Sequence, residues 1–304
     1  MSTVITKSLV LIIIIILGYS LKKIHVFGDT DYKVLTRMVM NIVLPLTMVS
    51  GYTKFTWKNE LLLIPFMALG INILLEVVAW LLSRNGNDMD RKYYMINTTS
   101  FGAGTFAMPF VQSVIGTDGV VACCMFDSLG TIMPSGVSYI CACASLKDEK
   151  REKIGPMFVI KRLIKSPPFV ANICMLILTI IGIRLPDIFV QLASKVADAN
   201  GFICMFMLGL MFEIQFSKTN LIRASKLIIF RYIICIAAAV LVFKFMPFDY
   251  ILRKSLVLVL LSPMGAMTLV FTDIIGGDTE LASFVQSICS IISLVLMISV
   301  IVLI

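Results

Sequence analysis

Apolar residues along this chain form ten long runs that are separated by short polar segments. A bilayer core about 30 Å thick requires roughly 20 apolar residues per helix. The expected membrane-spanning helices cover residues 4–21, 34–52, 60–82, 93–115, 119–146, 166–184, 197–215, 222–245, 251–275 and 281–304. The first run has no small-residue cleavage site and is followed by Lys22 and Lys23, so we expect a retained span rather than a signal peptide. The pattern predicts an all-α integral membrane protein with ten transmembrane helices.

The longest hydrophilic stretch separates the fifth run from the sixth. Residues 147–165 include Lys147-Asp148-Glu149-Lys150-Arg151-Glu152-Lys153, and we expect them to form a connecting loop. The expected organisation is a first five-helix part over residues 1–146, this loop, and a second five-helix part over residues 166–304. A short surface helix is expected over residues 186–195, before the seventh span.

Helix-breaking residues interrupt the fourth and ninth runs. Gly102-Ala103-Gly104-Thr105-Phe106-Ala107-Met108-Pro109 lies in the fourth, and Ser262-Pro263-Met264-Gly265 lies in the ninth. Lipid cannot hydrogen-bond the backbone groups that such breaks release, so irregular backbone survives there only where it is buried in protein or lines a cavity. Interrupted spans at matching places in two halves are typical of a secondary transporter's binding site. The alternative is that these residues only kink helices for packing.

Short matches between the halves indicate an inverted repeat. Ile115-Gly116-Thr117-Asp118 recurs as Ile275-Gly276-Gly277-Asp278, and Leu44-Pro45-Leu46 pairs with Leu208-Gly209-Leu210; Gly18 pairs with Gly182. Because five spans separate the equivalents, the second copy has the opposite orientation. We therefore expect a 5+5 inverted repeat in which broken helices 4 and 9 cross near the membrane midplane.

Composition supports the membrane assignment, and charge gives an orientation. The 304 residues are 59% hydrophobic and only 14% charged, against about a quarter charged in soluble domains. The side that holds the first, third, fifth and seventh connections has 18 of the 26 basic residues, a count that places Arg231 among them. The positive-inside rule then puts residues 147–165 in the cytosol and both termini outside, in the plasma membrane. The net charge of +8 reflects this bias, and we expect no nucleic-acid partner.

Motifs for enzymatic or metal chemistry are missing from the sequence. There is no Walker-type loop, no HExxH and no nucleophile with an adjacent base. His25 is the only histidine, and the eight cysteines form no CxxC pair, so free buried thiols are expected rather than metal ligands. We expect neither an enzyme nor a cofactor-binding protein.

Several motifs in order resemble the auxin efflux carrier family, which includes bacterial permeases related to plant PIN proteins, and more distantly the bile-acid sodium symporter fold. The motifs run over nearly the full length: Asn41-Ile42-Val43-Leu44-Pro45, Met108-Pro109 with Ile115-Gly116, Phe126-Asp127, Ser166-Pro167-Pro168-Phe169-Val170-Ala171, Leu208-Gly209, Ser262-Pro263, and Ile275-Gly276-Gly277-Asp278 with Ala282-Ser283. The resemblance implies a ten-helix carrier of organic anions with a scaffold part and a transport part. The chain departs from the family where an Asn-Thr-Gly-x-x-Gly-x-Pro motif usually precedes the span 4 proline, and where span 7 usually has Pro-x-Ala-Leu.

The candidate substrate-binding residues surround the two breaks and the span 2 proline. They are Asn41, Pro45, Asn97, Ser100, Gly104, Thr105, Pro109, Ser262, Pro263, Gly265 and Thr268. Pro45 releases a backbone carbonyl in span 2, and Asn41 either satisfies that carbonyl or faces the cavity. The threonines beside the breaks offer hydroxyl contacts, and half-helix N-termini favour anionic groups.

Two acidic residues fall within apolar runs. Asp127 lies near mid-depth in span 5, and we weigh a coupling site for H⁺ or Na⁺ against a structural hydrogen bond to Ser128 or Thr131. No basic residue is expected deep in a span as its partner. Glu76 lies toward the cytosolic end of span 3, where snorkelling or pairing near Arg84 explains it.

The leading hypothesis is a secondary transporter that moves a small organic anion, such as a carboxylate, across the lipid bilayer by alternating access. The alternative is a membrane receptor or sensor that keeps the fold without transport, which the altered span 4 motif suggests. Substrate identity and direction are not readable from the sequence, and a homodimer is one option for the assembly.

Overall fold

The computed structural model describes residues 2–28, 30–53, 58–146, 155–212, 218–265 and 267–303. Within these ranges the regular structure is entirely helical. The α-helices are α1 Ser2–Lys23, α2 Tyr32–Met38, α3 Leu44–Thr53, α4 Leu63–Ser83, α5 Asp88–Asn97, α6 Met108–Val114, α7 Thr117–Gly130, α8 Ser138–Ser145, α9 Pro156–Ile164, α10 Pro167–Ile181, α11 Asp187–Met211, α12 Lys218–Phe245, α13 Tyr250–Leu260, α14 Met267–Ile274 and α15 Thr279–Leu303. The shorter elements are the π-helices η1 Val39–Val43, η3 Ala103–Ala107 and η4 Met133–Val137, and the 3₁₀ turn η2 Asn59–Leu62. The expectation of an all-α protein is confirmed.

In the described part of the chain, five helical segments are long and apolar enough to cross a membrane by themselves. They are Tyr32–Thr53, Asn59–Ser83, Thr117–Ser145, Leu221–Phe245 and Thr279–Leu303. A sixth is formed if α9 and α10, which meet at 76°, count as one broken span. The protein is therefore a multi-pass membrane protein.

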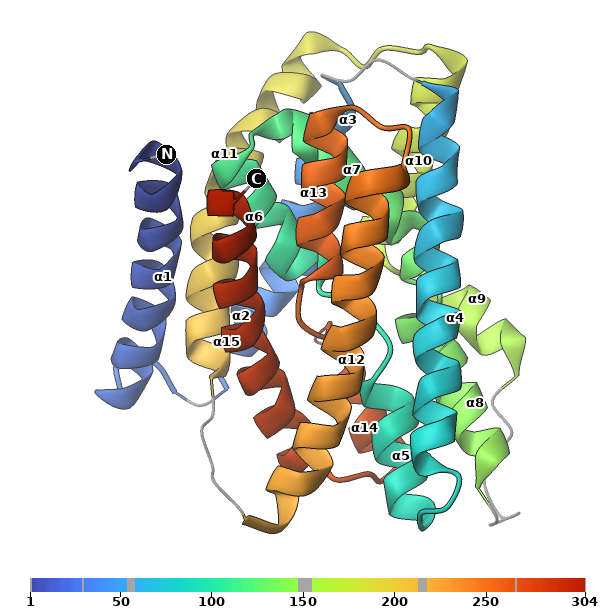
Figure 1. Cartoon of the computed structure of the whole chain (residues 1–304). Coiled ribbons are helices and arrows are strands. Elements are labelled where there is room, and N and C mark those ends of the chain that lie inside the picture. The colour runs from blue at the N-terminus through green and yellow to red at the C-terminus, as the bar shows by residue number, and fades with distance from the viewer. Residues whose placement is uncertain are drawn as a thin grey trace.

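The helices pack as two groups; in Figure 1, α1 and α11 of the first lie on the left, and α12 and α4 of the second lie to their right. In the first group, α11 packs along α1, α2 and α3, and α3 also packs against α10. In the second group, α7 packs between α4 and α13, α12 lies against α13, and α5 contacts α8 and α14. The C-terminal α15 contacts α14 and α12 of the second group and also reaches α1. Contacts of α3 with α7 and of α6 with α1 and α11 join the two groups.

Two expectations about the connections are wrong. The stretch over residues 186–195 is not a separate surface helix, because α11 continues without a break from Asp187 to Met211. The connecting segment is not all loop: residues 147–154 lie outside the described part, but α9 follows them. Its Val159 and Leu163 are buried, and Lys161 and Arg162 lie in its last turn. This pattern is expected for an amphipathic helix at the membrane–water interface.

Prolines shape the second and fourth expected spans in the same way. A π-helix ends two residues before Pro45 and another ends two residues before Pro109. Proline has no N–H to donate and its ring clashes with the preceding turn, so a wider turn just before it relieves the clash. In the second case Ala107 N–H donates to Gly102 O at 2.9 Å, five residues back. Each proline thus bends its span without ending it.

Candidate functional site

The first break lies between α5 and η3. Helix α5 ends at Asn97, and residues 98–102 are not helical. Ser100 has φ = 94°, a conformation that is uncommon outside glycine and that needs support from its surroundings. This break begins several residues before the expected stretch Gly102–Pro109, because Gly104 lies in η3 and Pro109 follows it in the first turn of α6, within one continuous helical segment.

The second break lies where the sequence predicts it. Helix α13 ends at Leu260, and residues 262–265 are not helical. Helix α14 is described from Met267 onward. Ser262 is fully buried, and its hydroxyl donates to the carbonyl of Val259 at 2.6 Å.

The two breaks contact each other in the protein interior. Gly102 N–H donates to Pro263 O at 2.8 Å, and Gly265 N–H donates to Ser100 Oγ at 2.8 Å. A β-carbon on Gly265 would lie 3.0 Å from Ser100 Oγ, so glycine permits this approach. We call residues 98–102 and 262–265 together the crossover.

A buried arginine holds the crossover together. Arg231, the fourteenth of the 28 residues of α12, is 0% exposed. Its Nη1 donates to Thr98 O at 2.6 Å, and its Nη2 donates to Ser100 O at 2.7 Å and to Ser262 O at 3.3 Å. Its guanidinium also lies 4.9 Å from the centre of the Phe101 ring. One side chain thus satisfies carbonyls that both breaks release.

Arg231 corrects two expectations from the sequence. It does not belong with the cytosolic loop charges, and a basic residue does lie deep in a span. Removing it from the charge count leaves 17 basic residues on that side against 8 on the other, so the sign of the bias is unchanged. Hydropathy alone cannot separate a buried arginine from one that reaches the interface.

Polar side chains from three further helices support the crossover. Asn72 of α4 accepts a hydrogen bond from Ser100 N–H at 3.2 Å. Asn97 donates to Thr272 Oγ1 of α14 at 3.0 Å, and Thr268 donates to Gly265 O at 3.0 Å. Of the candidate residues, the structure therefore brings together Asn97, Ser100, Ser262, Pro263, Gly265 and Thr268. Asn72 and Thr272, which the sequence did not single out, complete the set.

The remaining candidates of spans 2 and 4 lie beside the crossover rather than in it. A β-carbon on Gly104 would be 3.3 Å from Leu44, so η3 packs against the start of α3, where Pro45 lies. Thr105 is half-buried in η3. Asn41 is exposed, and its side chain donates to Arg37 O at 2.7 Å, one turn earlier in the same helix.

Asp127 lies in α7, directly after Phe126, which contacts the first break. Its neighbour Phe126 packs edge-on against Phe101, with ring centres 5.2 Å apart. Of the structural alternatives, the hydrogen bond to Ser128 is not made, because Ser128 donates to Met125 O. Among the described residues no hydrogen bond or ion pair reaches the Asp127 carboxylate, which is partly exposed.

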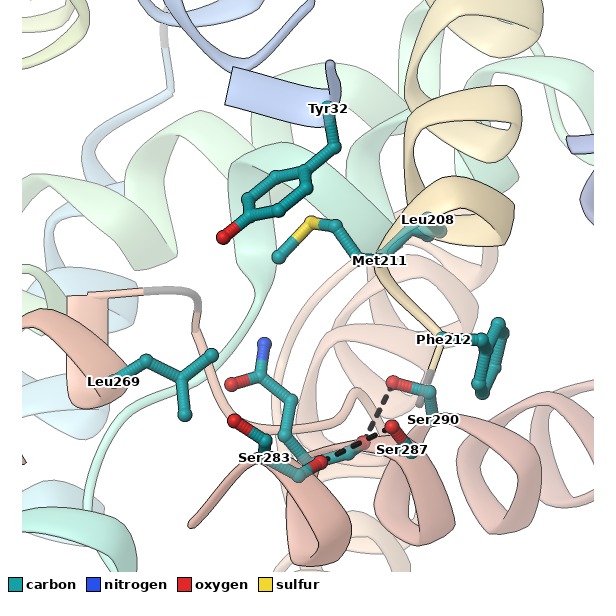
Figure 2. A pocket seen from close by; sticks show the side chains of 9 residues that line it. Tyr32, Leu208, Met211, Phe212, Leu269, Ser283, Ser287 and Ser290 are labelled. Atoms are coloured by element: carbon teal, nitrogen blue, oxygen red, sulfur yellow. Dashed lines mark hydrogen bonds between the residues drawn. The ribbon is translucent and has the colours of Figure 1, made fainter. Parts of the chain in front are cut away.

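A cavity opens between the two helix groups, next to α14. Figure 2 shows Tyr32, Leu208 and Met211 of the first group on one side, and Leu269 of α14 with Ser283 and Ser287 of α15 across from them. Ser287 donates to Ser283 O at 3.1 Å and Ser290 donates to Gln286 O at 2.8 Å. Gln286 also lines this cavity, and its buried Oε1 has no hydrogen-bond partner among the described residues. Most of this polar face escaped the sequence analysis, because serine and glutamine spaced along an apolar helix look like packing residues.

Comparison with known proteins gives one family and one relative. The sequence model of a family described as "Membrane transport protein" matches residues 3–301. An "Uncharacterized transporter" of Methanothermobacter thermautotrophicus is 24% identical over 218 residues, which cover 70% of this chain and 70% of that protein. The resemblance to auxin efflux carriers is thereby confirmed. With nearly the whole chain matched, this protein belongs to the membrane transport protein family, that of the auxin efflux carriers.

Proposed function

We propose that this protein is a secondary transporter that carries a small organic anion across the plasma membrane by alternating access. The observation that carries the proposal is the contact between the two breaks, at Gly102–Pro263 and Ser100–Gly265, around a fixed positive charge. Broken helices at membrane depth are tolerated where they are buried or line a solute pathway. The family to which the chain belongs also favours transport over an enzymatic role.

The architecture that fits this activity is a ten-span 5+5 inverted repeat. In support of it, Gly116 and Gly276 both have positive φ, at 111° and 63°, directly after the two interrupted spans. Other matches do not correspond in structure: Gly18 lies inside α1, whereas Gly182 is the left-handed C-cap of α10. The proposal therefore relies on the crossover spans and their exits.

The substrate pathway that we propose runs between the two helix groups. The cavity lined by Tyr32 and Met211 on one group and by Leu269 and Ser283 on the other lies on this boundary. Movement of the second group relative to the first would open or close it. Apolar residues there suit the body of an organic acid, while the hydroxyl and amide groups suit its polar end.

Energy for transport would come from an ion gradient, with Asp127 as a coupling residue for H⁺ or Na⁺. Its carboxylate has no partner within the described structure and lies next to Phe126, which contacts the crossover. Both termini outside the cell and a homodimeric assembly complete the proposal.

The decisive experiment combines binding and exchange. Purified protein is screened by thermal shift against organic acids, with and without sodium and at two pH values. The acids that stabilise it are then tested for counterflow in proteoliposomes. Stabilisation with counterflow supports a transporter; stabilisation without any counterflow or gradient-driven uptake supports the receptor alternative.

A further inference from the structure

Glu76 is a buried carboxyl group that has no salt-bridge partner among the described residues. It is the fourteenth of the 21 residues of α4 and is 8% exposed. At about 1.5 Å per residue it lies roughly 10 Å before the end of that helix. Neither of its oxygens has a hydrogen bond of normal geometry. The interpretation that it pairs near Arg84 at the interface is not what the structure shows.

Two hydroxyl groups face the Glu76 carboxyl group. They belong to Thr99 and Ser138, whose oxygens are 2.7 Å apart and bond each other. Thr99 lies in the first break, between the two residues whose carbonyls bind Arg231. Ser138 begins α8, two residues after Gly136, whose φ of 137° marks a second irregular point in that span. Glu76 therefore touches the crossover directly.

None of the charged or titratable groups described on the helices around α4 pairs with Glu76. On α8 the Cys141 thiol is influenced by Glu76, and on α12 Arg231 is committed to the carbonyls of the break. From α5, Arg91 bonds the carbonyls of Ser145 and Arg84 at the helix ends. On α7, Asp127 lies beside Tyr52 and Cys124 instead. No lysine or arginine of the described chain forms an ion pair with Glu76.

A proton fits this site better than a metal ion. An unpaired carboxylate at membrane depth is unfavourable unless it is protonated, paired or bound to a cation. The two hydroxyl groups carry two hydrogens, and one of these is used in the bond between Thr99 and Ser138, so at most one is left for the two carboxylate oxygens. A proton on the carboxyl group makes up this shortfall. Hard cations take about six or more oxygen ligands, and the 2.7 Å contact between Thr99 and Ser138 leaves no space for an ion between them.

We propose that Glu76 is a proton-binding site through which protonation controls the geometry of the crossover. Any effect of this proton on transport rests on the proposed transport function. The binding of the proton to Glu76 does not. A surface hollow of about 400 Å³ connects Glu76 with Trp80, Cys141 and Ser145 toward the end of α4. A hydronium ion that reaches this hollow gives its proton to the carboxylate, forming a neutral carboxylic acid and water. Loss of the proton leaves a charge that favours an arrangement in which Glu76 meets water.

The test uses the full-length protein and the matched variants Glu76→Gln and Asp127→Asn. Infrared difference spectra between acidic and alkaline pH record the carbonyl band of protonated carboxylic acids. We expect one component of this band to titrate in the wild type and in Asp127→Asn and to be missing in Glu76→Gln. Spectra that are the same for Glu76→Gln and the wild type overturn the proposal.

Two further measurements separate the possible outcomes. If Glu76→Gln does not fold, Ser138→Ala serves instead: removing a neighbouring hydroxyl should move the titration midpoint of the band, and an unmoved midpoint contradicts the proposal. Counterflow with an acid from the thermal-shift screen should lose its pH dependence in Glu76→Gln. If no acid is transported, the proposed function fails while the infrared result still decides whether Glu76 binds a proton.

Discussion

Gly18 of α1 and Gly209 of α11 lie directly against each other. A β-carbon on Gly18 would be 3.2 Å from Gly209 Cα and 2.5 Å from Phe206 O. A β-carbon on Gly209 would collide with the carbonyl of Ile15. Small residues let helix backbones approach closely in membranes, where packing rather than water exclusion holds helices together.

The first prediction follows from this contact. Gly209→Ala forces α1 and α11 apart, and overpacking of this kind costs about 1–3 kcal/mol. Thermal unfolding in detergent should show a lower midpoint for this variant. Gly70→Ala is the matched control: Gly70 lies in α4 with open space around its β-position, and there alanine should be neutral or stabilising. Equal midpoints for the two variants would contradict the close contact.

The second prediction concerns Ser100. Ser100→Ala removes the acceptor for Gly265 N–H and keeps the backbone at φ = 94°. Ser100→Gly also removes the acceptor, but it relieves the strain, which is worth about 1–3 kcal/mol. We therefore expect the glycine variant to be the more stable of the two in chemical or thermal unfolding. The reverse order would mean that the left-handed backbone is not strained there.

The third prediction concerns Arg231. Arg231→Met leaves the carbonyls of Thr98, Ser100 and Ser262 without their donor, and each buried unsatisfied group costs about 1–3 kcal/mol. The variant should unfold at a much lower temperature and lose transport. Lys226→Met, at an exposed position on the same helix, should change neither property. Arg231→Lys should recover only part of the stability, because an ammonium group cannot reproduce the planar fork.

The fourth prediction concerns Asp127. If it carries the coupling ion, Asp127→Asn should keep the fold and lose gradient-driven uptake. Counterflow exchange, which needs no net gradient, should survive better. Uptake with unchanged pH and sodium dependence would make Asp127 structural, as would failure of the variant to fold.

The fifth prediction concerns orientation. With the exposed native Cys174 replaced, a cysteine introduced at Lys150 should resist a membrane-impermeant reagent on intact cells, and one at the C-terminus should react. The expected result follows from the excess of basic residues on one side of the membrane. Labelling at Lys150 without labelling at the C-terminus would reverse the topology.

The sequence located the second break correctly and predicted an all-helical fold, because proline and long apolar runs leave clear local signals. It misplaced the first break: Thr98, Thr99 and Ser100 contain no helix breaker, and their irregular backbone is held by Asn72, Arg231 and Gly265 from distant parts of the chain. Such tertiary contacts have no signature in a single sequence.

The acidic and basic residues show the same limit. Glu76 lies toward the end of the expected span 60–82, and Arg231 lies ten residues into the expected span 222–245, but neither position tells where the side chain points. Their roles depend on which helix face points to the crossover, and that is set by packing. The serines of α15 were missed for the same reason, since their significance arises only where α2 and α11 lie opposite them.

The burial of Arg231 also makes the crossover independent of ions in the surrounding solution. Where two interrupted helices expose carbonyl groups to each other, hydrogen-bond donors or a cation must satisfy them, and a dissolved ion would make the fold depend on its concentration. Here the charge is covalently part of α12 and fully enclosed, and charges buried in this way are screened little by salt. The structure of the crossover should therefore be the same at low and at high ionic strength.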